Sequence, residues 1–282
     1  MAQPPIRRQR LVAELRRERE RRELSVQEAA ERVGWDPTKL SRIENMRIGI
    51  TGDDTLDLCE ALGVEEARAN ALARLARESR RRGWWHSYND VLGDFGGLLE
   101  LDLDAESLKE WEADVIPGAL QTRDYARAVI SSTWPDSPPE EIEKRVDLRM
   151  ERQERLHNTR HLKLWCTIDE AALMRPVGGR ETMADQLDRL AERARQPGVT
   201  VQVLPIDISG HPSMGAPFTV IDLADGATYV YVDTLSGGLY LEEPSDIAMY
   251  TTTMERLQAQ ALDFDRSVQM IKRYAAQQRT GP

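Results

Sequence analysis

The sequence predicts a multidomain protein, with an all-α domain followed by an α+β domain whose sheet is largely antiparallel. The chain has 282 residues, and one hydrophobic core seldom grows past about 250 residues. Helical spacing of apolar residues dominates the first part of the chain, whereas short alternating runs typical of strands recur after residue 105. The charge balance also changes, since residues 1–83 contain 18 Lys and Arg against 15 Asp and Glu, and residues 84–282 contain 20 against 33.

Residues 26–45, VQEAAERVGWDPTKLSRIEN, fit two short helices that cross at a tight turn. Ala30 is small enough for a close helix approach, and Gly34 can take the positive φ that ends one helix and redirects the chain. Asp36 can cap the second helix, while Pro37 loses no hydrogen bond in its first turn. The apolar side chains that this arrangement turns inward are Ala29, Val33, Leu40 and Ile43. The spacing therefore predicts a helix-turn-helix, a geometry of DNA readers, rather than an ordinary helical corner.

The outer face of the second helix carries polar side chains suited to DNA. The candidate contacts here are Thr38, Lys39, Ser41 and Arg42, with Arg47 just beyond the helix. Such side chains hydrogen-bond phosphates and base edges, and Arg42 has the geometry for two hydrogen bonds to guanine. Helices expected over residues 7–22 and 55–63 complete a compact domain of four to five helices.

The formal net charge of −10 seems at odds with binding to phosphate. However, the counts above give +3 for residues 1–83 and −13 for residues 84–282. Screening at physiological salt cuts off charge interactions beyond roughly 8 Å, so the local field decides docking. We therefore expect the acidic part of the chain to face away from DNA.

The segment LSVQEAAERVGWDPTKLSRIEN resembles the helix-turn-helix domain of the Cro and phage-repressor (XRE) family. The resemblance covers about residues 5–64 and implies sequence-specific binding to double-stranded DNA. This chain has Val26 where the family usually has Gln, and Met46 where it usually has Gly. The family commonly makes a phosphate contact from the first of these positions, and the resemblance implies that neighbouring Gln27 takes it over here. The second change is expected to alter only the turn that leaves the recognition helix.

The remaining chain is expected to form a connecting helix and linker at residues 65–89 and an α+β domain at 90–275. The Pro117-Gly118 and Asp225-Gly226 pairs mark turns, the second of them in a hairpin. Strands are expected within residues 107–116, 161–168, 199–206, 217–223, 228–234 and 238–241. Helices are expected after Thr122 or Asp124, over 139–158 and 180–196, and finally over 244–261.

Several long motifs of this region resemble the C-terminal domain of actinomycete-type XRE regulators, over about residues 90–275. They are WEADVIPGALQTRDYARAVI, RMERQERL, IDEAALMRPVGG, VTVQVLP, PFTVIDL and YVDTLSGGLYLE. The resemblance implies a role in transcription control, often beside a small partner protein, and some members are described as antitoxin-like. It leaves the biochemical role of this domain undefined.

One segment offers candidate ligand-binding or partner-binding residues, namely Gln121, Arg123 and Tyr125. The alternative is packing, in which Tyr125 joins Trp111, Ile116 and Leu120 as core around a turn. An aromatic cluster at residues 84–88 has the same two interpretations, packing between the domains or ligand stacking.

We expect no catalytic residues, metal or cofactor. His157 and His161 have a helical spacing, but no third ligand accompanies them. Asp169 and Glu170 follow a predicted strand, where helix capping is their ordinary use, and Glu181 lies among many other acids. Neither a GXSXG motif nor a glycine-rich phosphate loop occurs.

The composition predicts a soluble, cytoplasmic chain without a membrane contact. The sequence shows no signal peptide and no apolar run of the roughly 18 residues that a membrane span needs. Cys59 and Cys166 lie in apolar contexts, and we expect two buried thiols, as suits a reducing compartment.

The sequence as a whole predicts a homodimeric transcription regulator, because one recognition helix covers too few base pairs for selective binding. The acidic domain would supply dimerisation, partner binding or effector sensing. One alternative is an antitoxin-like interaction module that sequesters a small partner protein, with DNA binding secondary. Another is a receptor in which a small-molecule effector resets the spacing of the two readers.

Overall fold

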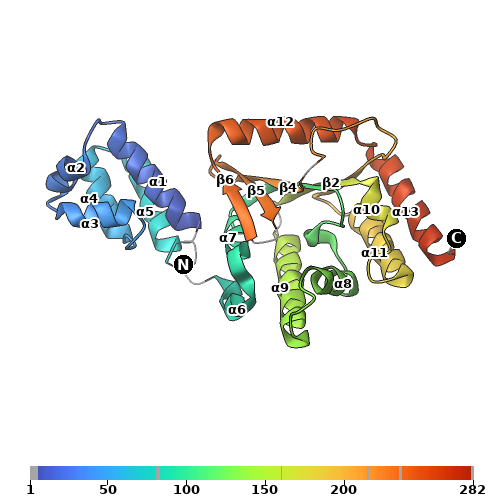
Figure 1. The fold of residues 1–282 in the computed structure, drawn as a ribbon. Helices are drawn as coiled ribbons and strands as arrows, with labels where there is room; N and C mark the ends of the chain where they lie inside the picture. Colours follow the sequence, from blue (N-terminus) through green and yellow to red (C-terminus); the bar gives the residue numbers. More distant parts are fainter. Residues whose placement is uncertain (1–5, 81–82, 160, 215, 235–236, 281–282) are drawn as a thin grey trace. The chain divides into compact units, whose positions relative to one another are not determined.

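The computed structural model describes residues 6–80, 83–159, 161–214, 216–234 and 237–280. The chain forms two compact units, Met1–Ser87 and Tyr88–Pro282 (Figure 1). The first unit is helical, and the second is built on a sheet with helices on its faces. The chain therefore has the two classes of domain that the sequence predicts.

Five helices form the first unit around one hydrophobic core. They are α1 (Ile6–Glu20), α2 (Val26–Val33), α3 (Pro37–Glu44), α4 (Gly52–Leu62) and α5 (Glu66–Glu78). Leu11 of α1, Leu40 of α3 and Leu58 of α4 meet in this core, which also includes Leu72 and Ala76 of α5. Helix α5, within the stretch expected to connect the domains, thus contributes to the core of the first unit. A short 3-10 helix, Trp84–Tyr88, follows it.

Local sequence signals determine where these helices begin and end. Ser25 and Glu28 form a capping box at the start of α2, and Gly34 ends that helix with φ +75°. The carboxylate of Asp36 accepts a hydrogen bond from the Thr38 amide at 2.7 Å, and it thereby caps α3. Met46, just beyond α3, has φ +56°, a left-handed conformation that glycine adopts without strain.

The second unit contains a six-stranded mixed sheet with the order β3-β2-β1-β4-β5-β6. Its strands are β1 (Ala105–Glu112), β2 (Lys163–Asp169), β3 (Val199–Leu204), β4 (Phe218–Leu223), β5 (Thr228–Thr234) and β6 (Gly237–Leu241). The antiparallel pairings are β1 with β4, β4 with β5 and β5 with β6, whereas β1 with β2 and β2 with β3 pair in parallel. The sheet is therefore mostly antiparallel, as the sequence predicts, but it is mixed rather than purely antiparallel. The physical reason is that helical crossovers separate β1, β2 and β3, and such crossovers allow parallel pairing.

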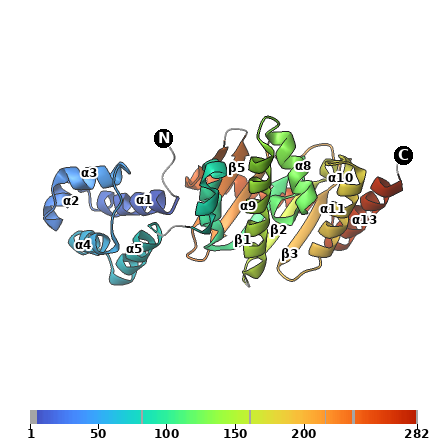
Figure 2. The same ribbon diagram turned by 90° about the horizontal axis from the view of Figure 1, so that it is seen from below.

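Helices cover both faces of this sheet. They are α6 (Asn89–Leu92), α7 (Gly96–Asp102), α8 (Arg123–Thr133), α9 (Pro139–Asn158), α10 (Glu170–Met174), α11 (Arg180–Arg193), α12 (Pro244–Gln260) and α13 (Phe264–Thr280). Helix α12 lies along one face, and α8 and α9 lie on the other (Figures 1 and 2). Helix α13, which the sequence analysis did not anticipate, packs against α11.

The two faces of the sheet differ in chemistry. Under α12, Trp111 and Phe218 join Met254 and Leu257 in an apolar cluster. On the opposite face, Glu110 of β1 lies 3.9 Å from a guanidinium nitrogen of α9. The face under α9 therefore carries charged groups into the interior, where each needs a partner to offset the loss of hydration.

Candidate functional site

The helix-turn-helix presents α3 with an exposed polar face. Thr38 and Arg42 are exposed, and Ser41 is half-buried beside Asn45, which donates a hydrogen bond to the Ser41 carbonyl at 2.8 Å. The Arg42 guanidinium has no hydrogen bond or ion pair to any other residue that the structure describes. Its donors are thus available for an acceptor outside this unit.

Two further predicted contacts flank this face. Arg47, beyond the end of α3, is exposed and has no side-chain partner among the described residues. Gln27, in the first turn of α2, is exposed and donates a hydrogen bond to Glu31 at 3.0 Å. Both side chains can reach solvent without breaking a buried contact.

Lys39 is the exception among the predicted DNA contacts. Its ammonium group donates a hydrogen bond to Asp54 of α4 at 2.7 Å and lies 3.7 Å from the centre of the Trp35 ring. Burial raises the pKa of Asp54, but hydrogen bonds from Lys39 and Thr51 outweigh it and lower that pKa overall. Lys39 therefore joins α3 to α4 inside the unit.

A second ion pair, which the sequence analysis missed, fixes the other end of α3. Arg19 of α1 donates two hydrogen bonds to Glu44, at 2.7 and 2.9 Å, and a third to the Leu24 carbonyl at 2.6 Å. Both side chains of the ion pair are nearly buried, with exposed fractions of 10% and 8%. The sequence did contain one indication that Arg19 is buried. Arg19 lies four residues after Leu15, which lies four after Leu11, so all three share the inward face of α1.

The three candidate residues of the second unit do not share an exposed surface. Gln121 is buried and donates a hydrogen bond to the Ile116 carbonyl at 2.7 Å. Tyr125 is also buried, and its hydroxyl accepts a hydrogen bond from the Ile116 amide at 3.1 Å. Burial raises the pKa of Tyr125 to about 12. Arg123 lies on the exposed side of α8, where it is paired with Asp147 of α9. Gln121 and Tyr125 thus brace the turn after β1.

Beneath α9 lies a buried ion pair that sequence reasoning did not find. Arg152 donates hydrogen bonds to both carboxylate oxygens of Asp102, at 2.7 and 3.2 Å. Glu110 lies beside this pair, and the Cys166 thiol donates to its carboxylate at 3.7 Å. Burial raises the pKa of Glu110, although the nearby Arg152 opposes the rise. In the sequence of β1, Glu110 is an acidic residue at a position where the alternation of polar and apolar residues places an inward-facing side chain. This was the only feature of the sequence that indicated a buried charge.

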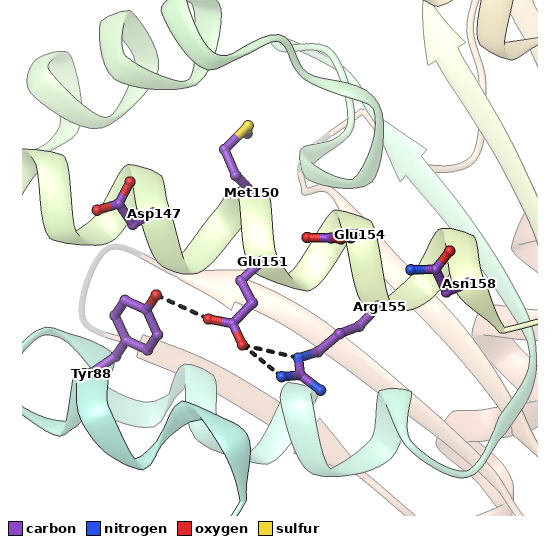
Figure 3. Close-up of a pocket in the computed structure, with 7 residues that line it drawn as sticks. All are labelled: Tyr88, Asp147, Met150, Glu151, Glu154, Arg155 and Asn158. Carbon is purple, nitrogen blue, oxygen red and sulfur yellow. Dashed lines mark hydrogen bonds and ion pairs between the residues drawn. The ribbon is translucent and has the colours of Figure 1, made fainter.

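A polar groove of about 560 Å³ runs beside α9 (Figure 3). Its lining residues are Tyr88, Asp147, Met150, Glu151, Glu154, Arg155 and Asn158. The Tyr88 hydroxyl donates to one oxygen of Glu151 at 3.0 Å, while Arg155 donates to the other at 2.7 and 3.1 Å (Figure 3). The central carboxylate of the groove is therefore already paired on both sides.

The residues considered for metal or acid chemistry have structural partners. His157 lies 2.9 Å from a guanidinium nitrogen of Arg193, and the Asp169 carboxylate caps α10. Glu170 is buried and accepts hydrogen bonds from the Tyr274 hydroxyl at 2.6 Å and the Ile206 amide at 3.0 Å. Within the described residues, no group of three or more His, Cys, Asp or Glu side chains is arranged to hold a metal ion.

His161 and Glu181, the remaining two of these candidates, are exposed. Cys59 and Cys166 are buried as free thiols. No helix in the described parts of the chain is both long and apolar enough to cross a membrane.

The fold and the exposed face of α3 define a helix-turn-helix DNA-binding protein with a separate α+β domain. A family model described as a helix-turn-helix domain matches residues 10–72. A second model, described as domain of unknown function (DUF5753), matches residues 95–273, which is more than half of the chain. The chain belongs to this family. No curated protein matches it, and no solved structure does.

Proposed function

We propose that the protein is a sequence-specific transcription regulator of the XRE type that reads double-stranded DNA with α3. The observation that carries the proposal is the Arg42 guanidinium, exposed and unpaired within its own unit, on a helix that ion pairs fix at Lys39 and Glu44. A reader helix must hold its side chains in a fixed register with the base edges. The two ion pairs supply that rigidity.

In this proposal the six predicted contacts have different roles. Arg42 reads a base, because its guanidinium can donate two hydrogen bonds to guanine. Thr38, Ser41, Gln27 and Arg47 contact phosphates and set the register. Lys39 chiefly orients α3 through Asp54 and Trp35, and any phosphate contact that it makes competes with that hydrogen bond.

The regulator would act as a homodimer. Two recognition helices about one DNA turn apart read enough base pairs for selective binding, whereas one does not. The second unit would supply the dimer contact and receive a partner protein or a small effector. We propose a binding role for it rather than catalysis, since the polar residues described above serve capping and ion pairing.

The test is a comparison of full-length variants on operator sequences selected from a random pool. Arg42→Ala should cost roughly 1–3 kcal/mol and relax one operator position. Arg47→Ala should weaken binding to every sequence and lower the salt slope by about one. Arg21→Ala removes the same charge from an exposed position just beyond the end of α1 and serves as the control. Equal losses across all sequences for Arg42→Ala would contradict its role as a base reader.

The acidic excess of residues 84–282 favours a second candidate function, an antitoxin-like module that binds a small basic partner protein. In that case DNA binding would be secondary. Cells carrying the chromosomal Arg42→Ala variant discriminate the two functions. A regulator loses control of its target genes in this variant, whereas a sequestering module keeps its effect on the partner.

A further inference from the structure

Two carboxylates share the face of the sheet beneath α9, near the ends of β1 and β5. The register pairs Glu110 with Thr219 and Thr219 with Tyr231. Glu112 lies two residues after Glu110 on β1, and Asp233 lies two residues after Tyr231 on β5. The two strands run in the same direction, and side chains two residues apart on a strand share a face, so Glu112 and Asp233 lie on the same face as Glu110. With β4 between them, their backbones are about 10 Å apart, which is two strand spacings.

Helix α9 brings two arginines to this face, and they differ in how fully they are paired. Arg152 is buried, donates two hydrogen bonds to Asp102 and lies 3.9 Å from the carboxylate of Glu110. Arg149, one turn earlier, donates to the side-chain oxygen of Gln121 at 2.8 Å. Among the described residues it has no ion pair. Most of the five donors of its guanidinium are therefore unused.

Gln121 holds the Arg149 guanidinium in place. Gln121 as a whole is 4% exposed, and its side-chain amide nitrogen donates a hydrogen bond to the Ile116 carbonyl at 2.7 Å. The oxygen of the same amide is thereby fixed toward Arg149. The guanidinium is thus oriented in advance, as is typical of a side chain that binds a ligand rather than one that follows solvent.

Glu112 has neither a hydrogen bond nor an ion pair to any other residue that the structure describes. Its pKa is raised well above the ordinary value by burial first and by Glu110 and Asp233 second, and Arg149 only partly opposes this. Burial likewise raises the pKa of Asp233. Opposite charges thus lie near one another without pairing, and the carboxylates outnumber the guanidinium groups.

The arrangement is open to solvent. Asp233 is exposed, and Glu112 and Arg149 are half-buried. Gly118 lies beside the two arginines, and a methyl group added there would approach only their nitrogens, at 3.9 and 4.0 Å. A small molecule can therefore reach the charged groups from the end of the sheet.

We propose that Glu112, Asp233, Arg149 and Gln121 form a binding site for a small zwitterion of the α-amino acid class. The carboxylate of the ligand accepts hydrogen bonds from Arg149, and its ammonium group donates to Glu112 and Asp233. A purely anionic ligand would face the excess of carboxylates, and a purely cationic one would face Arg149. The molecule that satisfies both sides carries both charges.

Ligand binding itself is independent of DNA reading, and only the role of the ligand as an effector rests on the proposed function. Ligand binding is tested by measuring ligand affinity without DNA. The role of the ligand as an effector is tested by measuring operator affinity with and without the ligand. Binding without any change in operator affinity retains the site and removes its regulatory role.

The experiment screens full-length protein against each proteinogenic α-amino acid by thermal denaturation. At least one should raise Tm by about 5 °C or more at a hundredfold excess over its Kd. Its N-acetyl derivative and its methyl ester should each lose the effect, because each removes one charge. The inference is overturned when no amino acid raises Tm, or when either derivative acts as strongly as the parent.

Calorimetric titration of variants locates the site. Glu112→Gln should weaken binding at least tenfold, and the fold should tolerate it because Glu112 has no partner to leave behind. Glu140→Gln removes the same charge from an exposed position at the start of α9 and should bind as the parent does. Unchanged affinity in Glu112→Gln would assign the ligand to another place on the protein.

Discussion

The ion pair between Arg19 and Glu44 gives the sharpest test of how the recognition helix is held. Each side chain of the pair is at most 10% exposed, and three hydrogen bonds fix the guanidinium. Removing one partner of such a buried pair leaves an uncompensated charge, which costs about 3–5 kcal/mol. Glu44→Gln should therefore destabilise the first unit by about 3 kcal/mol. The value is near the lower limit because the amide oxygen still accepts one hydrogen bond and the half-exposed Glu20 remains 3.5 Å from the guanidinium.

Two further variants separate charge from shape. Glu20→Gln makes the same chemical change at a half-exposed carboxylate that pairs with Arg16 and also lies 3.5 Å from the Arg19 guanidinium. It should have little effect, because solvent screens this carboxylate. Replacing both partners, as Arg19→Met with Glu44→Leu, removes both charges and leaves mainly the Leu24 carbonyl without its donor. That double variant should cost about 1 kcal/mol, less than Glu44→Gln alone.

The assay is hydrogen exchange of the α3 amides in the full-length chain, read by mass spectrometry. A loss of 3 kcal/mol corresponds to exchange more than a hundredfold faster, since 1.4 kcal/mol is a factor of ten. Equal exchange in Glu44→Gln and Glu20→Gln would show that the buried pair does not hold α3. A double variant as unstable as the single one would attribute the loss to shape rather than charge.

Three other predictions concern the backbone, the interior acids and the thiols. Met46→Gly should be more stable than Met46→Ala by about 1 kcal/mol in urea denaturation, because only glycine avoids the strain of the positive φ; equal stabilities would contradict this. The raised pKa of Glu112 stabilises the fold at acid pH, and this contribution is lost as pH rises. Glu112→Gln should therefore raise Tm at pH 8 and leave it unchanged near pH 4, and a uniform shift would argue against titration of this group. Burial raises the pKa of Cys59 to about 11 and that of Cys166 well above its ordinary value. Iodoacetamide at pH 8 should therefore alkylate the folded chain much more slowly than the urea-unfolded chain, as measured by intact-mass spectrometry.

Local signals were enough to predict the helix-turn-helix. Asp36, Pro37 and Gly34 act through the backbone within three residues of themselves, so their roles can be read from neighbouring positions. The same is true of the hairpin at Asp225-Gly226, where Gly226 takes a positive φ of 85°. The expected helix over residues 139–158 coincides with α9.

The pairing of the strands depends on distant parts of the chain, and here the prediction was incomplete. Helices follow β1 and β2, a pattern that favours parallel pairing, but alternation within each strand carries no information about its neighbour. Helix α13 was missed although Val268, Ile271 and Ala275 recur at helical spacing and are buried. The last predicted helix ended at residue 261 and the predicted domain at 275, whereas α13 continues to Thr280.

Side-chain partners were the least predictable part of the candidate sites. Lys39 was predicted to contact DNA, and nothing near it in the sequence shows that Asp54 of the next helix accepts its hydrogen bond. Similarly, the sequence places Gln121 in a turn but does not reveal Arg149 across from it. Charged residues are common in this chain, so a pairing between distant ones becomes visible only when the fold brings them together.

The division of the chain at Ser87 has an evolutionary consequence. The hydrophobic cluster built on Leu11 and Leu72 uses residues of the first unit alone, and the cluster built on Trp111 and Leu257 uses residues of the second alone. Recombination near this boundary would leave both clusters whole. Under the proposed function, a lineage could therefore exchange the helix-turn-helix domain and keep the effector-binding domain, and the same effector would then control a new set of genes.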